Sequence, residues 1–245
     1  MVVDLIVCLD STTPGAPALL AKAVSRAAAC RARLRVLDLC APDALGMATS
    51  PTSLEFVEDM RAAFRLGRVD GHHEMAPTDP AGLLERTLSA DLVIAGRGAA
   101  TSPHRSGVSA PALGALGPPV LIEADGSAGP AGRRILLPWR ADRASTRAIH
   151  DAMPLLKTAD EVVLVPLDDG SPATVMRRLA GRGVRVRAET SVDDADSALA
   201  PLARRVGADL IVVGLGGPAH WRAPTVLTLL ARLIDDSSTA LLVSR

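Results

Sequence analysis

The stretch ADLVIAGRG at residues 90–98 returns in the second half of the chain as ADLIVVGLG at residues 208–216. In each copy an Ala-Asp pair precedes a run of apolar residues that includes β-branched ones, and glycines follow. A short apolar run that closes on glycine is typical of a buried strand ending in a tight turn. Self-similarity of this kind indicates a structural unit that occurs twice.

Two further pairs of stretches recur around this one in the same order. LIVCLD at 5–10 corresponds to ILLPWR at 135–140, and an Ala-rich stretch of helical period follows each. PVLI at 119–122 corresponds to TALLV at 239–243. The similarity therefore extends over most of both halves.

A stretch at residues 125–132, DGSAGPAG, separates the two copies. Its Gly, Pro and Ser content is typical of a flexible connection. Each half of the 245-residue chain exceeds the roughly 40 residues below which a hydrophobic core usually fails. The sequence predicts two domains, 1–124 and 133–245, with a linker between them.

Short apolar runs alternate with amphipathic stretches in both halves, which is the pattern of parallel strands joined by crossover helices. The expected strands are 3–9, 33–39, 67–73, 91–95, 119–123, 134–138, 161–167, 184–188, 209–213 and 240–244. The expected helices are 15–31, 54–65, 80–89, 142–157, 172–181, 194–206 and 224–234. Because the runs are apolar throughout, helices should cover both faces of each sheet. The predicted fold class is α/β, with a five-stranded parallel sheet in each half.

Composition and charge exclude several classes of partner. The 27 basic and 27 acidic residues cancel, so no overall field attracts nucleic acid or an anionic membrane. The chain has few aromatic side chains on which bases could stack, with two Phe, two Trp and no Tyr. Residues 1–10 lack the features of a signal peptide, and no run of about 18 apolar residues occurs. We expect a cytoplasmic protein without nucleic-acid or membrane partners.

The cysteines and the paired histidines are not expected to carry chemistry. Cys8, Cys30 and Cys40 have no C-x-x-C spacing and lie in or beside apolar segments, which predicts reduced core residues. His72 and His73 are adjacent on an expected strand. Neighbours on a strand point to opposite faces, so the two are not expected to chelate one metal ion.

The repeated motifs resemble those of the universal stress protein family, and the resemblance covers essentially the whole chain. It rests on the first strand that ends in Asp before hydroxyl residues (LDST, 9–12), on the Ala-Asp strand with its glycines, and on the closing apolar strand. It implies a tandem member with two sandwich domains of the adenine nucleotide alpha hydrolase-like, Rossmann-like type. It also implies that strands 119–123 and 240–244 pair the two halves of one chain as an internal pseudo-dimer. The protein would then be a monomer of this kind or a homodimer of two such chains.

ATP-binding members of this family carry a glycine pattern after the fourth strand: Gly, two residues, Gly, nine residues, Gly, then Ser or Thr. Glycines there let backbone N–H groups approach phosphate oxygens. In the second half, Gly214 and Gly217 match the pattern, but Leu227 stands where the third glycine is expected, before Thr228. The resemblance therefore implies a second site with an altered phosphate loop.

The first half keeps a different part of this pattern. Ala95 is read in place of the first glycine, Gly98 matches the second, and Gly107 comes one residue early with Ser109 shortly after it. Gly96 lies inside the same loop. The first half thus retains a shortened form of the phosphate loop.

The nucleoside positions of the family are also divided between the halves. Asp10 matches the acidic residue at the end of the first strand, whereas Arg140 takes its place in the second half and cannot accept hydrogen bonds. Leu39 and Leu167 stand where the family places an apolar residue against the base. The implied ligand is ATP or another adenine nucleotide, with Mg²⁺ only if ATP binds. The resulting candidate site residues are Asp10, Ser11, Leu39, Gly96, Gly98, Gly107, Ser109, Leu167, Gly214, Gly217 and Thr228.

Several of these residues have a second interpretation that the sequence leaves open. Asp10 either contacts a nucleoside or caps the following helix with its hydroxyl neighbours. The glycines either cradle phosphate or turn the chain tightly. Arg97, Arg105 and Arg222 either pair with phosphates or form solvated surface. Trp139 either stacks on a base or fills a disused pocket.

Two functions of different classes remain open. The leading hypothesis is a non-catalytic stress-response or regulatory protein that holds an adenine nucleotide at a partly degenerate site. The alternative is an interaction or structural module that has lost nucleotide binding in both halves, as the missing glycine in each half suggests. Nucleotidyl transfer would need a signature such as His-x-Gly-His, which the chain lacks. At most, weak ATP hydrolysis is expected.

Overall fold

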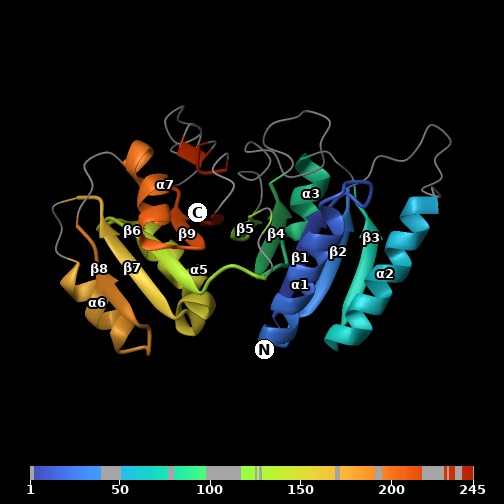
Figure 1. Ribbon diagram of the computed structural model, residues 1–245, viewed down its shortest axis with the longest axis horizontal. Coiled ribbons are helices and arrows are strands. Elements are labelled where there is room, and N and C mark those ends of the chain that lie inside the picture. The colour runs from blue at the N-terminus through green and yellow to red at the C-terminus, as the bar shows by residue number, and fades with distance from the viewer. Residues whose placement is uncertain are drawn as a thin grey trace. The chain divides into compact units, whose positions relative to one another are not determined.

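The computed structural model divides the chain into two compact units, Met1–Pro130 and Ala131–Arg245 (Figure 1). This division falls inside the stretch 125–132, and the domain bounds 1–124 and 133–245 stay a prediction. The structure describes residues 3–39, 51–76, 80–97, 117–124, 126, 129–168, 172–190, 195–216, 229–230, 232–234 and 239–244.

The first unit is a parallel sheet in the order β3-β2-β1-β4-β5. Its elements are β1 (Asp4–Leu9), α1 (Ala16–Cys30), β2 (Arg33–Asp38), α2 (Pro51–Gly67), β3 (Gly71–Met75), α3 (Pro80–Thr87), β4 (Leu92–Gly96) and β5 (Val120–Glu123). The strand order changes direction between β1 and β4. In open parallel sheets a ligand binds beyond the carboxyl ends of the strands at such a point.

The second unit contains a parallel sheet in the order β10-β9-β6-β7-β8. Its elements are β6 (Arg134–Trp139), α5 (Arg143–Thr158), β7 (Glu161–Pro166), α6 (Ala173–Ala180), β8 (Val186–Ala188), α7 (Ala195–Val206), β9 (Leu210–Gly214) and β10 (Ala240–Ser244). Here the strand order changes direction between β6 and β9. The predicted α/β class with parallel sheets is confirmed.

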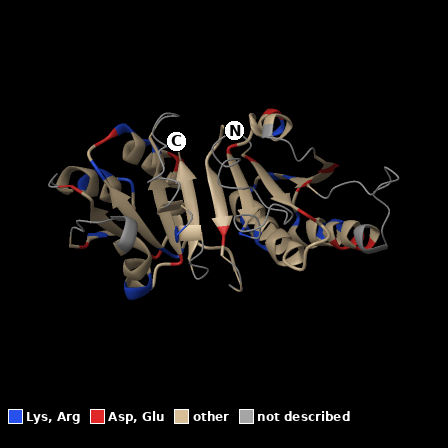
Figure 2. Ribbon diagram, turned by 90° about the horizontal axis from the view of Figure 1, so that it is seen from above, with Lys and Arg blue, Asp and Glu red and all other residues tan. Residues whose placement is uncertain are grey.

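Helices cover both faces of each sheet, as the unbroken apolar strands predict (Figure 2). The figure also shows acidic and basic residues distributed over each unit. No helix in the described part of the chain is long and apolar enough to cross a membrane.

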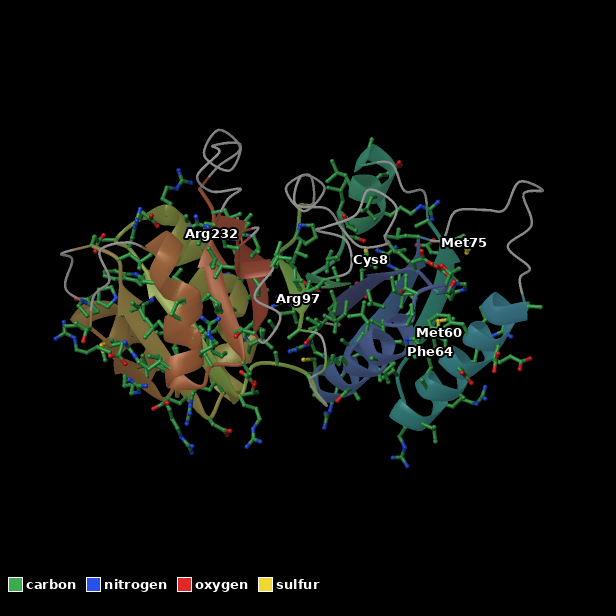
Figure 3. All side chains as sticks on the ribbon, turned by 45° about the horizontal axis from the view of Figure 1, so that its top comes forward. Cys8, Met60, Phe64, Met75, Arg97 and Arg232 are labelled. Carbon is green, nitrogen blue, oxygen red and sulfur yellow. The ribbon has the colours of Figure 1, made fainter. Side chains whose placement is uncertain are left out.

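The largest side chains of the first core lie between the sheet and the pair α1 and α2. Leu5, Val7 and Leu9 of β1 point to this face, together with Leu34 and Val36 of β2. The helix α2 contributes three large side chains that are at most 9% exposed, two of them labelled in Figure 3: Phe56, Met60 and Phe64. The helices α1 and α2 therefore pack closely against each other and against the sheet.

The strand expected at 67–73 lies further along the chain, at Gly71–Met75. The helix α2 continues to Gly67 and ends in a left-handed turn at Arg68, whose φ is 52°. Val69 N–H donates to the Phe64 carbonyl at 3.0 Å, which closes the helix as a Schellman motif. The apolar residue of this segment, Val69, therefore belongs to a helix end, so the expected boundaries were wrong. Of the helix expected at 224–234, the described residues are helical.

The expectation that all cysteines lie in the core holds for only one of the two that are described. Cys8 in β1 is fully buried, and burial raises the pKa of its thiol to about 12. Cys30, the last residue of α1, is exposed, so the core interpretation was wrong for it. Cys40 lies outside the described residues.

Candidate functional site

The candidate site of the first unit lies at the carboxyl ends of β1, β2 and β4. Leu9 and Asp38 are partners in the parallel register, and Leu39 N–H donates to the Leu9 carbonyl at 2.7 Å. The residue after β1, Asp10, therefore lies beside Leu39, which is 8% exposed. Gly96 closes β4 on the other side of β1. The structure thus brings Asp10, Leu39 and Gly96 to one edge of the sheet.

The Asp10 carboxylate organises the loop that leads into α1. Its Oδ1 accepts hydrogen bonds from Thr12 N–H at 2.8 Å and from Thr12 Oγ1 at 2.6 Å. This is an Asx turn, in which the side chain replaces a backbone acceptor. The helix α1 begins later, at Ala16, and its N-cap Gly15 has no side-chain cap. The interpretation of Asp10 as a helix cap was therefore wrong.

Ser11 is buried beneath this loop, at 5% exposed. Its N–H donates to Asp38 Oδ1 at 3.1 Å, while its Oγ is buried and has no hydrogen-bond partner among the described residues. An unmatched buried hydroxyl costs roughly 1–3 kcal/mol, so a ligand group or a water molecule that contacts it would be favoured. Among the candidate site residues that the structure describes, Ser11 thus offers a buried hydroxyl group that a ligand could contact.

Asp38 is a residue of this site that the sequence reasoning missed. It is 2% exposed, and its Oδ2 lies 3.6 Å from His73 Nε2 on β3. The signal that could have found it is an acidic residue at the end of an apolar strand, which is the pattern that singled out Asp10. A buried carboxylate here fixes the position of Ser11 and so shapes the floor of the site.

Arg97 follows β4 directly and is 6% exposed. Its interpretation as solvated surface was therefore wrong. A guanidinium that is mostly removed from water interacts more strongly with an anion than an exposed one does. Arg105 and Arg222, the other two arginines considered from the sequence, lie outside the described residues.

The register of the strands identifies the glycines that correspond in the two units. Gly96 closes β4 opposite Glu123, and Gly214 closes β9 opposite Ser244. Gly96, rather than Ala95, is therefore the structural counterpart of Gly214. The phosphate-loop residues that follow lie outside the described part of the chain: Gly98, Gly107, Ser109, Gly217, Leu227 and Thr228.

The two glycines differ in what surrounds them. A Cβ on Gly214 would overlap the backbone of Ala144 and would lie 2.9 Å from Ser145 N, in the first turn of α5. A Cβ on Gly96 would meet the Leu19 Cδ2 methyl at 3.3 Å, and the end of a leucine side chain can move. Helix packing thus requires glycine at 214, whereas it does not strictly require glycine at 96.

The corresponding edge of the second unit is built differently. Three residues, 140–142, join β6 to α5, whereas six residues, 10–15, join β1 to α1. Asp142 caps α5 by accepting from Ser145 N–H at 2.7 Å, and Ser145 Oγ accepts from Arg140 N–H at 3.1 Å. The first turn of α5 therefore lies directly against the strand ends.

The other expected site positions of the second unit match those of the first in backbone geometry but not in the charged side chain. Leu167 is half-buried, and its N–H donates to the Trp139 carbonyl at 2.9 Å, as Leu39 does to Leu9. The Arg140 side chain is exposed. Within the described ranges, no group of three or more His, Cys, Asp and Glu residues could hold a metal ion. The second unit keeps the geometry of the strand ends without the carboxylate.

Comparisons with known proteins identify the fold. No family model and no curated protein matches the chain. A universal stress protein from Archaeoglobus fulgidus DSM 4304 is similar with a TM-score of 0.69 and 15% identity, over 98% of this chain and 96% of that one. A putative universal stress protein from Pseudomonas aeruginosa UCBPP-PA14 has a TM-score of 0.66 and 15% identity, over 99% and 93%. The chain therefore has the fold of universal stress proteins over nearly its full length.

Proposed function

We propose that the protein is a non-catalytic regulatory protein of the universal stress protein type, and that its first unit binds an adenine nucleotide. The fold shared with universal stress proteins supports the type of protein. The side chains at the carboxyl ends of β1, β2 and β4 support the choice of unit. A cytoplasmic location and a role in the stress response belong to the same proposal.

The observation that carries this proposal is the difference between Gly96 and Gly214. Packing against α5 accounts for the glycine at 214, because a Cβ there would overlap the helix backbone. Packing does not account in the same way for the glycine at 96. A glycine at a strand end that packing does not require is available for close approach of the backbone to a ligand.

The described side chains around Gly96 fit an adenine nucleotide. Asp10 offers carboxylate oxygens to ribose hydroxyls, which are donors. The buried Ser11 hydroxyl gains a partner when a polar ligand group reaches it. Leu39 gives the base an apolar contact, and Arg97 supplies positive charge beside the phosphates. When ATP is the nucleotide, it brings Mg²⁺ and the negative charge that Arg97 balances.

The second unit is proposed not to bind nucleotide. Its strand-end carboxylate is replaced by the exposed Arg140, and the first turn of α5 lies over Gly214. These features favour an interaction or structural role for this half. If the first unit also fails to bind, the same role applies to the whole chain.

The experiment begins with the purified protein, which is denatured so that any released nucleotide can be identified by chromatography. ATP is then titrated calorimetrically into the wild type, Asp10→Ala and Arg140→Ala. We expect binding in the wild type, a roughly tenfold or greater loss in Asp10→Ala, and no change in Arg140→Ala, because a hydrogen bond to a charged group contributes about 1.5–3 kcal/mol. Neither released nucleotide nor heat in the wild type would instead favour the interaction module.

A further inference from the structure

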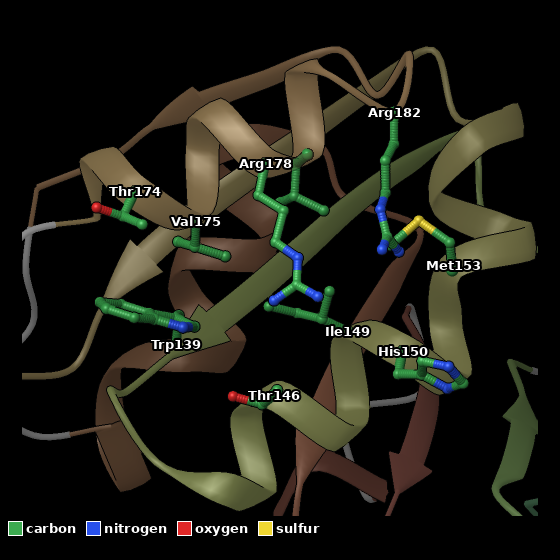
Figure 4. Close-up of a pocket in the computed structure, with 10 residues that line it drawn as sticks. Trp139, Thr146, Ile149, His150, Met153, Thr174, Val175, Arg178 and Arg182 are labelled. Atoms are coloured by element: carbon green, nitrogen blue, oxygen red, sulfur yellow. The ribbon is translucent and has the colours of Figure 1, made fainter.

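A cavity of about 200 Å³ opens between α5 and α6 in the second unit (Figure 4). Its lining comes from α5, from α6 with the turn after it, and from the end of β6, and includes neither Arg140 nor Gly214. Trp139, at the end of β6, forms one wall with its indole ring. The other apolar walls come from Ile149 and Met153 of α5 and from Val175 and Leu179 of α6.

The cavity exists because α6 lacks the large side chains of its counterpart in the first unit. There, α2 is 17 residues long and buries Phe56, Met60 and Phe64. In contrast, α6 is 8 residues long and buries only Leu179. Protein interiors are normally close-packed, so a space of this size beside an aromatic ring is a candidate site for a small ligand.

Two arginines extend across this cavity from the α6 side. Figure 4 shows Arg178 and Arg182 reaching toward α5, with their guanidinium groups near Ile149 and Met153. Among the residues that the structure describes, no carboxylate pairs with either guanidinium. By contrast, Arg187 nearby in the sequence pairs with two carboxylates, at 3.1 and 3.0 Å. Two like charges that no described carboxylate neutralises, beside an apolar space, favour an anionic ligand.

The volume and the shape of the walls limit the ligand. A cavity of roughly 150 Å³ lined by apolar side chains holds benzene. The present cavity is somewhat larger, and it adds an aromatic wall at Trp139 and two guanidinium groups. We propose that this cavity binds a small aromatic carboxylate of about the size of benzoate, with its ring beside Trp139 and its carboxylate between Arg178 and Arg182. A nucleotide is too large, because sites for larger ligands occupy about 300–1,000 Å³.

Benzoate and its neutral analogue benzamide are the probes that test this proposal. The Trp221→Phe variant leaves Trp139 as the one tryptophan of the two in the chain, so that its fluorescence reports on the cavity. We expect saturable binding of benzoate with a change in Trp139 emission, and binding of benzamide that is roughly tenfold weaker or more. Equal affinity for benzamide, or no saturable change with benzoate, would overturn the proposal.

The arginines are tested in the same Trp221→Phe background. The double change Arg178→Gln and Arg182→Gln should weaken benzoate binding roughly tenfold or more and leave benzamide binding nearly unchanged. Both side chains are exposed, so the fold should be retained, which circular dichroism checks. Arg177→Gln is the matched control, because Arg177 lies on the same helix but does not line the cavity. If Arg177→Gln weakened benzoate binding as much as the double change, general charge rather than this cavity would be responsible.

Discussion

Asp10 shows how one side chain serves both the loop and the proposed ligand. Its Oδ1 holds Thr12 in an Asx turn, and the turn places Ser11 inside the protein. The position of Asp10 could be predicted, because the end of an apolar strand is readable in the sequence. The burial of Ser11 and the part played by Asp38 could not, because they depend on how the loop of six residues folds before α1 begins.

At the same scale, the two described cysteines should differ in reactivity. The thiolate is the reactive form, and the pKa of the Cys8 thiol is raised to about 12 by burial. With iodoacetamide at about pH 8, we expect Cys30 to be alkylated quickly and Cys8 to react only after denaturation, as peptide mass spectrometry would show. Alkylation of Cys8 in the folded protein at the rate of Cys30 would contradict its burial.

The raised pKa of Cys8 also has a consequence for stability. In the unfolded chain this thiol ionises near its ordinary value of 9.0, whereas in the folded chain it stays protonated up to about pH 12. The unfolded state therefore binds fewer protons above pH 9.0, so stability falls as the pH rises between these two values. A Cys8→Ala variant should show a weaker decline over this range in chemical denaturation experiments.

At the end of α2 the backbone adopts a conformation that the residue found there does not prefer. Arg68 adopts a left-handed conformation that glycine adopts without strain. We expect Arg68→Gly to raise the free energy of unfolding by about 0.5–1 kcal/mol, measured by urea denaturation. The matched control Arg61→Gly, in the interior of the same helix, should lower it by about 1 kcal/mol.

The contact between β9 and α5 gives a second prediction about elements. Gly214→Ala places a methyl group against the backbone of Ala144, which should cost about 1–3 kcal/mol and lower the Tm. Gly96→Ala meets only the end of Leu19, so its cost should be smaller, while ATP binding should weaken. If Gly96→Ala lowered the Tm as much as Gly214→Ala, packing would require glycine at both positions. The difference that places the nucleotide in the first unit would then be lost.

Most elements could be predicted because their apolar patterns are local. The β3 boundaries could not, since the segment GRVD at 67–70 contains an apolar residue, Val69, that belongs to the end of α2. The cavity between α5 and α6 could not be predicted either. It arises from the lack of large side chains on α6, and that lack matters only after the helix has been placed beside α5.

At the scale of the whole molecule, pairing of the halves through strands 119–123 and 240–244 remains a prediction. The linker at 125–132 connects two units that each contain a complete parallel sheet. If the units pair, NMR relaxation should give one rotational correlation time for both. Two distinct correlation times, each typical of a half-sized domain, would contradict the pairing.

The proposed nucleotide binding is confined to the first unit. Native mass spectrometry of the purified chain with excess ATP measures this directly, because each bound nucleotide adds a resolved mass. We expect one ATP per chain in the wild type and in Arg140→Ala, and, at an ATP concentration near the wild-type Kd, a much lower occupancy in Asp10→Ala. Two nucleotides per chain, none in the wild type, or an occupancy in Asp10→Ala equal to that of the wild type would contradict this confinement.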